Sequence, residues 1–365
     1  TTVPHENDAE KAVNETKVRG KQSVFAGLGW LDRLLALWLF LAIALGMILG
    51  ALVPSAQPTL QRGEFVGVSI PIAVGLLVMM YPILCKVRFE KLHRVFAHRQ
   101  IWIQLLFSIV VNWIIAPLVM LALAWAFLPD EPGLRTGLIF VGIARCIAMV
   151  LIWTSLAGGD EEYCAILVAV NSLLQMVLFA PLAIFFVNII SRGGTMPVGY
   201  DVVARSVGVF LGIPLGAAIL TRAVVRSINP TWYDQKFIKI IAPFSLIGLL
   251  YTVIVLFASQ GKNVTDQIVF VVRVAAPLIV YFFVIFFAVL LACKRLGFGY
   301  KLAATQSFTA ASNNFELAIA VAVATFGANS DEALASTVGP LIEVPVLVFL
   351  VYFVKWIAPR WGWDD

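Results

Sequence analysis

The apolar residues of this chain are grouped in long runs that are separated by short polar segments. Ten runs approach the roughly 20 residues with which a helix crosses the hydrocarbon layer of a bilayer. The runs are continuously apolar and do not alternate with a period of two, which predicts helices and not barrel strands. The pattern therefore predicts an all-α integral membrane protein of ten transmembrane helices. The approximate bounds are 34–53, 66–85, 101–128, 137–157, 163–190, 203–221, 240–259, 268–293, 303–327 and 333–355.

The composition excludes a soluble globular enzyme. Of the 365 residues, 61% are hydrophobic and 13% are charged, whereas soluble domains carry about 25% charged residues. The net charge of +5 does not indicate a nucleic-acid partner, because the basic residues lie between apolar runs. Four scattered cysteines do not make a disulfide framework. The three histidines all lie in polar segments, which excludes a histidine-ligated metal inside the membrane. No cofactor is expected.

Residues 1–29 are polar and mixed in charge, which predicts a flexible cytoplasmic tail and no cleaved secretory signal. Lys and Arg gather in the segments that would share one side of the membrane. Because such residues mark the cytoplasmic side, both termini are predicted to be cytoplasmic in a plasma (inner) membrane protein. The segments that carry most of these residues are 11–33, 86–99, 222–239, 294–301 and 355–360.

Three short motifs of the first half recur in the same order in the second half. The pairs are 40–46 with 210–216, 116–118 with 276–278, and 160–161 with 331–332. Chance similarity among apolar helices is the alternative, and the identical order of the motifs in the two halves argues against it. The chain then divides into repeat 1 (30–190) and repeat 2 (191–365). Each repeat holds five helices, an odd number, so the second must be inverted. Inverted repeats with a midplane site are typical of secondary transporters.

Only three charged residues lie well inside the predicted spans: Arg145, Glu316 and Glu343. A charge at a helix centre costs about 2.5–3.5 kcal/mol on insertion scales, so such residues usually face a cavity or a partner. A purely structural ion pair or snorkelling is the alternative for each. The repeat places Arg145 opposite Glu316. We therefore expect these two side chains to approach each other where the fourth and ninth helices cross.

The ninth span contains Ser312, Asn313 and Asn314 shortly before Glu316. Small and amide residues at this density predict an interrupted helix whose freed backbone lines a polar cavity. Close packing through small residues is the alternative, but it does not explain the amides. Cys146 follows Arg145 in the fourth span. A buried cysteine is by default a small hydrophobe; alternatively it offers one sulfur ligand to a cargo that must be released.

Four stretches strongly resemble the arsenical-resistance arsenite efflux permeases of the bile acid/arsenite/riboflavin transporter superfamily. They are GIARCIAMV at 142–150, NSLLQ at 171–175, SNNFELAIA at 312–320 and GPLIEVPV at 339–346. The resemblance covers all ten helices. It implies an inverted-repeat fold with the fourth and ninth helices broken and crossing at the midplane. It also implies arsenite efflux coupled to proton entry, with the essential cysteine at Cys146 and the essential glutamate at Glu316.

The chemistry of arsenite agrees with this resemblance. Arsenite in neutral water is mainly an uncharged trihydroxide that also binds thiols, so its pocket needs a soft sulfur and hydrogen-bonding groups. Cys146 supplies the sulfur. We expect the further binding and supporting residues to be Ser312, Asn313, Asn314, Glu316, Arg145, Glu343, Asn112, Asn171 and Gln175. The sequence leaves open whether antimonite is accepted, which ion drives transport and whether the chain forms a homo-oligomer.

Three other functions are compatible with a chain of this class. A sodium-coupled organic-anion symporter of the bile-acid type would need sodium sites of carboxylates and carbonyls, and the prominent sulfur and the scarcity of buried acids count against it. An intramembrane enzyme would need clustered Asp or His, whereas the acidic clusters 160–162 and 331–332 are better interpreted as helix caps in loops. A passive channel differs from a transporter only in its response to a gradient.

Overall fold

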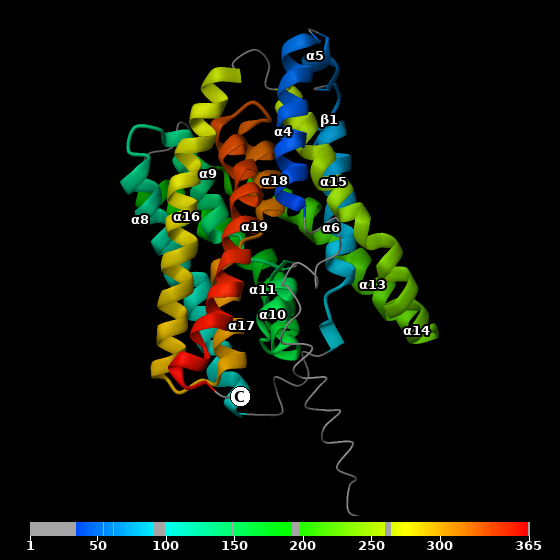
Figure 1. Cartoon of the computed structure of the whole chain (residues 1–365). Coiled ribbons are helices and arrows are strands. Elements are labelled where there is room, and N and C mark those ends of the chain that lie inside the picture. Colours follow the sequence, from blue (N-terminus) through cyan, green and yellow to red (C-terminus); the bar gives the residue numbers. More distant parts are fainter. Residues whose placement is uncertain are drawn as a thin grey trace, which may run out of the picture.

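The computed structural model describes residues 34–363 apart from 54, 61, 91–98, 148, 192–196 and 260–263. Helices make up most of this part of the chain (Figure 1). Two short antiparallel strands, β1 (Glu64–Phe65) and β2 (Val68–Ser69), form a hairpin. The expectation of an all-α membrane protein is confirmed at this level. The predicted tail over residues 1–29 lies outside the described residues.

Six helices among the described residues are long and apolar enough to cross a membrane. They are Ile101–Phe127, Glu161–Ser191, Tyr200–Ile228, Pro230–Ser259, Ile268–Arg295 and Asp331–Ile357. Shorter apolar helices accompany them, namely Leu37–Leu52, Ile70–Cys85, Pro132–Ile143 and Phe315–Phe326. The short ones include parts of the fourth and ninth predicted spans, where the sequence predicted interruptions.

Each of the ten predicted runs falls on one helix or on consecutive helices. The elements of the first half are α4 (Leu35–Leu52), α5 (Ala56–Leu60), α6 (Ile70–Cys85), α7 (Arg99–Val110), η2 (Val111–Ile115), α8 (Ala116–Phe127), α9 (Pro132–Ile143), α10 (Met149–Ala157), α11 (Glu161–Ala183) and η3 (Ile184–Ser191). Those of the second half are α12 (Tyr200–Val207), η4 (Gly208–Gly212), α13 (Ile213–Ile228), α14 (Pro230–Trp232), η5 (Tyr233–Phe237), α15 (Ile238–Ser259), α16 (Val264–Arg295), α17 (Tyr300–Ala311), α18 (Phe315–Phe326), α19 (Asp331–Ile357) and η6 (Pro359–Trp361).

Two long helices widen into a π-helical turn immediately before a proline. The η2 turn precedes Pro117 of α8, and the η4 turn precedes Pro214 of α13. Proline lacks an N–H group and its ring crowds the carbonyl four residues earlier, so the preceding turn must rearrange. Both helices continue after the proline without a break.

The helices form two packed groups. In one group α15 packs along α6 and α4, and α13 packs on α6; in the other α19 packs on α9 and α16, and α16 on α17. Figure 1 shows α6 and α13 on one side of the molecule and α8 and α16 on the opposite side. The helix α18 contacts members of both groups, because it packs on α19 and α9 and also on α6. The helix α18 therefore lies where the two groups meet, and α19 also contacts α4 there.

Arg135 precedes the fourth predicted span and was therefore expected in a loop. In the structure it lies in a helix. It belongs to α9 and is 3% exposed. Its Nη1 donates to the carbonyls of Leu128 and Pro129 at 2.9 and 3.0 Å, and its guanidinium stacks 3.8 Å from the ring of Trp125. The exposed carbonyls after the C-terminus of α8 and the aromatic face make this buried position tolerable for a cation.

The acidic loops act as helix starts, as predicted, but in two different ways. Asp160 is the N-cap of α11, because its Oδ1 accepts a hydrogen bond from the Tyr163 amide at 2.9 Å. At the corresponding start of α19 the cap is Ser330, whose hydroxyl accepts from the Ala333 amide. Asp331 and Glu332 follow in the first turn, where negative charge favours a helix N-terminus.

Candidate functional site

The fourth and ninth predicted spans are both interrupted, and the two interruptions lie against each other. The backbones of Arg145 and Asn313 form an antiparallel β-bridge, and the Asn314 amide donates to the Ala144 carbonyl at 3.0 Å. The Asn313 side chain adds a 2.8 Å bond from Nδ2 to the Val141 carbonyl. Broken helices leave backbone groups that must find partners away from water. Here each interruption supplies partners for the other.

Asn314 has a second role as the N-cap of α18. Its Oδ1 accepts a hydrogen bond from the Leu317 amide at 3.1 Å, as amide side chains do at helix starts. Its Nδ2 has no hydrogen-bond partner in the described part of the chain, and the same holds for Oδ1 of Asn313. Both residues are 2% exposed. Buried amide atoms without partners usually mark a place for a ligand or water.

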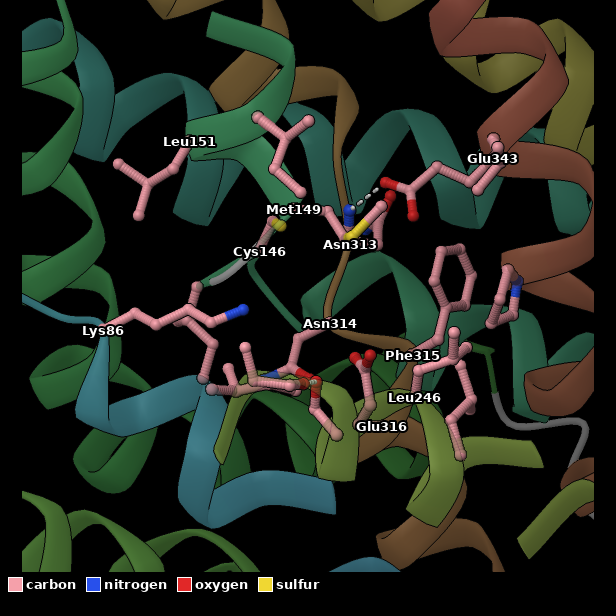
Figure 2. Close-up of a pocket in the computed structure, with 18 of the residues that line it drawn as sticks. Lys86, Cys146, Met149, Leu151, Leu246, Asn313, Asn314, Phe315, Glu316 and Glu343 are labelled. Atoms are coloured by element: carbon pink, nitrogen blue, oxygen red, sulfur yellow. Dashed lines mark hydrogen bonds between the residues drawn. The ribbon is translucent and has the colours of Figure 1, made fainter. Parts of the chain in front are cut away.

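A cavity of about 370 Å³ opens at the crossing. The sequence-predicted residues Cys146, Asn313, Asn314, Glu316 and Glu343 all line it. Figure 2 shows the side chains of Cys146, Asn314 and Glu316 at one common space, toward which Lys86 extends from beyond the end of α6. The rest of the lining is mostly apolar and comes from Ile83, Ile147, Met149, Leu151, Ile152, Ala242, Pro243, Leu246, Leu249, Phe315, Pro340 and Val344, with Lys239 and Ser245.

The two acids of the cavity are held differently. Glu343 in α19 accepts a 2.5 Å bond from the hydroxyl of Ser312 and a 3.3 Å bond from the amide of Asn313. Glu316 lies in the first turn of α18 and is partly exposed to the cavity. Among the described residues no ion pair involves either acid. Ser312 therefore belongs to the site through Glu343, although it does not line the cavity.

The expected approach of Arg145 to Glu316 does not take the form of an ion pair. No ion pair joins them in the part of the chain that the structure describes. The guanidinium of Arg145 donates instead to the carbonyls of Gly142 and Ala310 and to the hydroxyl of Tyr281. The backbone of Arg145 pairs at the crossing with Asn313, whereas Glu316 lies in the first turn of α18.

The predicted supporting residues Asn112, Asn171 and Gln175 lie away from the cavity lining. Gln175 accepts a 2.9 Å bond from the Arg145 amide and so supports the first interruption. Asn171 accepts from the indole of Trp113 at 3.2 Å, and Asn112 donates to the Ser108 carbonyl at 2.8 Å. Only Gln175 thus supports the backbone at the crossing, whereas Asn112 and Asn171 satisfy polar groups of α7, η2 and α11.

Three features were missed in the sequence. Lys86 and Lys239 line the cavity but had been counted only as loop charges. Tyr281 was not singled out, although a tyrosine within the apolar run 268–293 needs a polar partner when buried. Gly339 is the third: a Cβ there would overlap the ring of Phe315, so this position of α19 must be small. In the sequence, only the glycine and proline that begin the motif at 339–346 indicated that this position is special.

The site can bind a small ligand with one sulfur, two amides and two carboxyl groups. A single thiol gives a soft ligand that can be released, and the amide atoms Oδ1 of Asn313 and Nδ2 of Asn314 offer one acceptor and one donor. The described residues contain no group of three His, Cys, Asp or Glu that could hold a metal ion. The thiol and the two amide atoms suit a hydroxylated species that also binds thiols.

Comparisons with known proteins agree with this chemistry. The model of the Sodium Bile acid symporter family matches residues 73–267. The chain is 47% identical to the arsenical-resistance protein Acr3 of Corynebacterium glutamicum over 95% of this chain and 94% of the relative. It is 32% identical to the Acr3 of Alkaliphilus metalliredigens over 89% and 92% of the two chains. It is also 34% identical to an uncharacterized transporter, slr0944, of a Synechocystis species over 90% and 89%.

The matches to the three relatives extend over nearly the whole chain and include both helix interruptions. They confirm the resemblance that the stretches around Cys146 and Glu316 indicated. The chain belongs to the Sodium Bile acid symporter family and, within it, to the group of the arsenical-resistance permeases.

Proposed function

We propose that this chain is a secondary active transporter that exports arsenite from the cytoplasm in exchange for protons, with antimonite as a further cargo. The observation that carries the proposal is the cavity at the crossing, where the Cys146 thiol, two unsatisfied amide atoms and two carboxyl groups line one space. Two of the relatives are named as arsenical-resistance proteins and one as a transporter, and these names support transport and not catalysis.

The cargo binds through one reversible covalent step. The Cys146 thiol attacks As(OH)₃, an S–As bond forms, one As–O bond breaks, and the hydroxide leaves with the thiol proton as water. The product is a thiolate-bound As(OH)₂ group, and addition of water reverses the step without any change in oxidation state. Asn313 Oδ1 accepts from one remaining hydroxyl and Asn314 Nδ2 donates to the other. A single sulfur lets the cargo leave, whereas several would retain it.

The architecture proposed for this function is ten transmembrane helices in two inverted halves, with both termini cytoplasmic in the plasma membrane. The interruption between α9 and α10 and the one between α17 and α18 occupy matching places in the two halves. Their pairing by a backbone bridge supports this symmetry. The cavity is lined by Lys86 and Lys239, from segments predicted to be cytoplasmic. We therefore assign the structure to a state that loads cargo from the cytoplasm.

Protons move on the two carboxyl groups. Glu316 faces the cavity, and Glu343 is held by Ser312 at the second interruption. A carboxyl group that is alternately exposed to the two sides can carry a proton inward while the thiol carries arsenite outward. We expect Glu316→Gln to insert and fold normally and to lose coupled efflux, because the amide keeps the size of the side chain but cannot release a proton.

The test is arsenite uptake into everted membrane vesicles with and without an imposed proton gradient. Wild type should accumulate arsenite only with the gradient, and Cys146→Ser should not accumulate it. Cys164→Ser is the matched control, since this buried cysteine receives a hydrogen bond from Thr154 and does not line the cavity. Gradient-independent equilibration would identify a channel. Uptake that persists in Cys146→Ser and requires sodium would identify the organic-anion symporter instead.

A further inference from the structure

The guanidinium of Arg145 is the most deeply buried charge near the crossing. The residue is 0% exposed, and no carboxylate within ion-pair distance accompanies it among the described residues. An isolated buried charge is strongly unfavourable unless oxygen atoms replace its water shell. The oxygens that surround the guanidinium therefore indicate which ligand the site is built to hold.

The oxygens come from the ends of two broken helices and from one tyrosine. Gly142 lies in the last turn of α9, which ends at Ile143, and Ala310 lies in the last turn of α17, which ends at Ala311. Both carbonyls accept hydrogen bonds from the guanidinium. The Tyr281 hydroxyl accepts from Nη1 and Nη2 at 3.3 Å each and donates to the Ala310 carbonyl.

Converging carbonyls of this kind form a cation site. The last carbonyls of a helix lack intrahelical partners and carry the negative end of its dipole. In secondary transporters, unwound carbonyls and half-helix C-termini coordinate sodium. Here the C-termini of α9 and α17, which end at the two interruptions, converge on one positive charge, and that charge belongs to the chain itself.

We propose that Arg145 is a built-in cation that occupies, permanently, the place of an alkali ion at the crossing. The inference rests on the proposed arsenite transport. Arg145 is then a positioning residue: it ties the C-terminal ends of α9 and α17 together and so sets the spacing between Cys146 and Asn313. Because a covalently attached charge cannot dissociate, this place cannot load and unload a coupling ion. Arsenite transport by this chain therefore requires no sodium, and the coupling ion must bind at Glu316 or Glu343.

The experiment has a transport arm and a binding arm. Initial rates of arsenite uptake into everted vesicles are measured for wild type in sodium, potassium and choline chloride at one proton gradient. They are then measured for Arg145→Ala with and without millimolar guanidinium or sodium. Arg135→Ala is the matched control, because Arg135 is equally buried and is also held by carbonyls, but lies far from the crossing in α9, close to its start.

The expected results are specific to a cation site. Wild type should transport at the same rate in all three salts. Arg145→Ala should lose at least about tenfold in rate and regain part of it with guanidinium or sodium, whereas Arg135→Ala should not respond to either ion. A sodium requirement in wild type would overturn the inference, and so would an Arg145→Ala variant that transports like wild type.

Thermal unfolding separates this inference from the proposed function. In purified protein without arsenite, guanidinium or sodium should raise the melting temperature of Arg145→Ala relative to choline and leave that of wild type unchanged. This shift with no arsenite transport in wild type would retain the cation site and reject the transport function. Arsenite transport by wild type without this shift in Arg145→Ala would retain the transport function and reject the cation site. If Arg145→Ala does not fold, Arg145→Gln, which removes the charge and keeps most of the size of the side chain, is used in the same comparison.

Discussion

The hydroxyl of Ser312 donates a 2.5 Å hydrogen bond to Oε1 of Glu343, joining the second helix interruption to the middle of α19. The Asn313 amide reaches the same oxygen at 3.3 Å. Through these two bonds, the position of the buried acid and the path of the backbone at the crossing depend on each other.

Replacement of Ser312 by alanine should therefore destabilise the protein and impair transport together. A hydrogen bond to a buried acid contributes about 1–3 kcal/mol, so we expect a lower melting temperature and a slower arsenite uptake in Ser312→Ala. Ser336→Ala is the control, because the Ser336 hydroxyl is equally buried in α19 but bonds only to the Glu332 carbonyl of its own helix. Equal effects in the two variants would show that the Ser312–Glu343 bond has no special role.

Gly339 allows Phe315 to lie against α19. A Cβ at Gly339 would overlap the Phe315 ring, and Phe315 stands between Asn314 and Glu316. Overpacking of this kind costs about 1–3 kcal/mol, and the displaced ring should carry both polar neighbours with it. We expect Gly339→Ala to lose arsenite uptake while it still inserts.

Two further variants make the Gly339 prediction specific. Gly216→Ala, at a helical position in α13 where a Cβ meets open space, should leave uptake unchanged. The double variant Gly339→Ala/Phe315→Leu should recover part of the lost uptake, because the smaller side chain makes room for the new methyl group. Absence of any recovery would place the cause elsewhere.

Glu90 joins the segment that follows α6 to α13 through an ion pair with Arg222. Its carboxylate accepts from Arg222 Nε and Nη2 at 2.8 and 2.5 Å, and Arg226 lies 3.1 Å away. Partial burial alone would raise the pKa of Glu90, but the hydrogen bonds and charge of Arg222, together with Arg226, outweigh it and hold the pKa below its ordinary value. The pair therefore stabilises the fold above the unfolded-state pKa of about 4.3, and this contribution disappears as the pH falls through the lower folded-state pKa.

We expect Glu90→Gln to unfold at a lower temperature than wild type at pH near 7. Since Glu90 is 38% exposed, solvent screening limits the loss to about 0.5–1 kcal/mol. The difference should shrink as the pH falls through the lowered pKa of Glu90, because wild type then loses the same charge. Thermal unfolding in detergent at both pH values measures it, with Glu64→Gln on the exposed hairpin as control. A difference that is constant with pH would contradict the assignment.

Asp160 supplies the N-cap of α11. Loss of the side chain in Asp160→Ala removes the bond to the Tyr163 amide and should cost about 1 kcal/mol. Asp160→Asn keeps an acceptor oxygen at the same place and should stay close to wild type. The two melting temperatures, compared directly, test whether the cap or the charge matters; equal losses in both would indicate the charge.

The sequence alone determined the class of the protein and five of the residues that line the cavity. Long apolar runs require helices in a membrane because unpaired backbone groups are not tolerated there, and each predicted run coincides with helical segments. Cys146, Asn313, Asn314 and Glu316 could be selected because polar side chains inside such runs are costly without a function. Their neighbours in the chain also carried the family resemblance.

Tertiary structure decided how these residues face one another. The sequence could not show that the backbones of Arg145 and Asn313 pair while the Arg145 side chain donates to Tyr281, because those contacts join segments far apart in the chain. Nor could it show that Lys86 and Lys239 reach the cavity or that Gly339 receives the Phe315 ring. Residue type determines that a buried group needs a partner; only the packing of helices determines which partner is within reach.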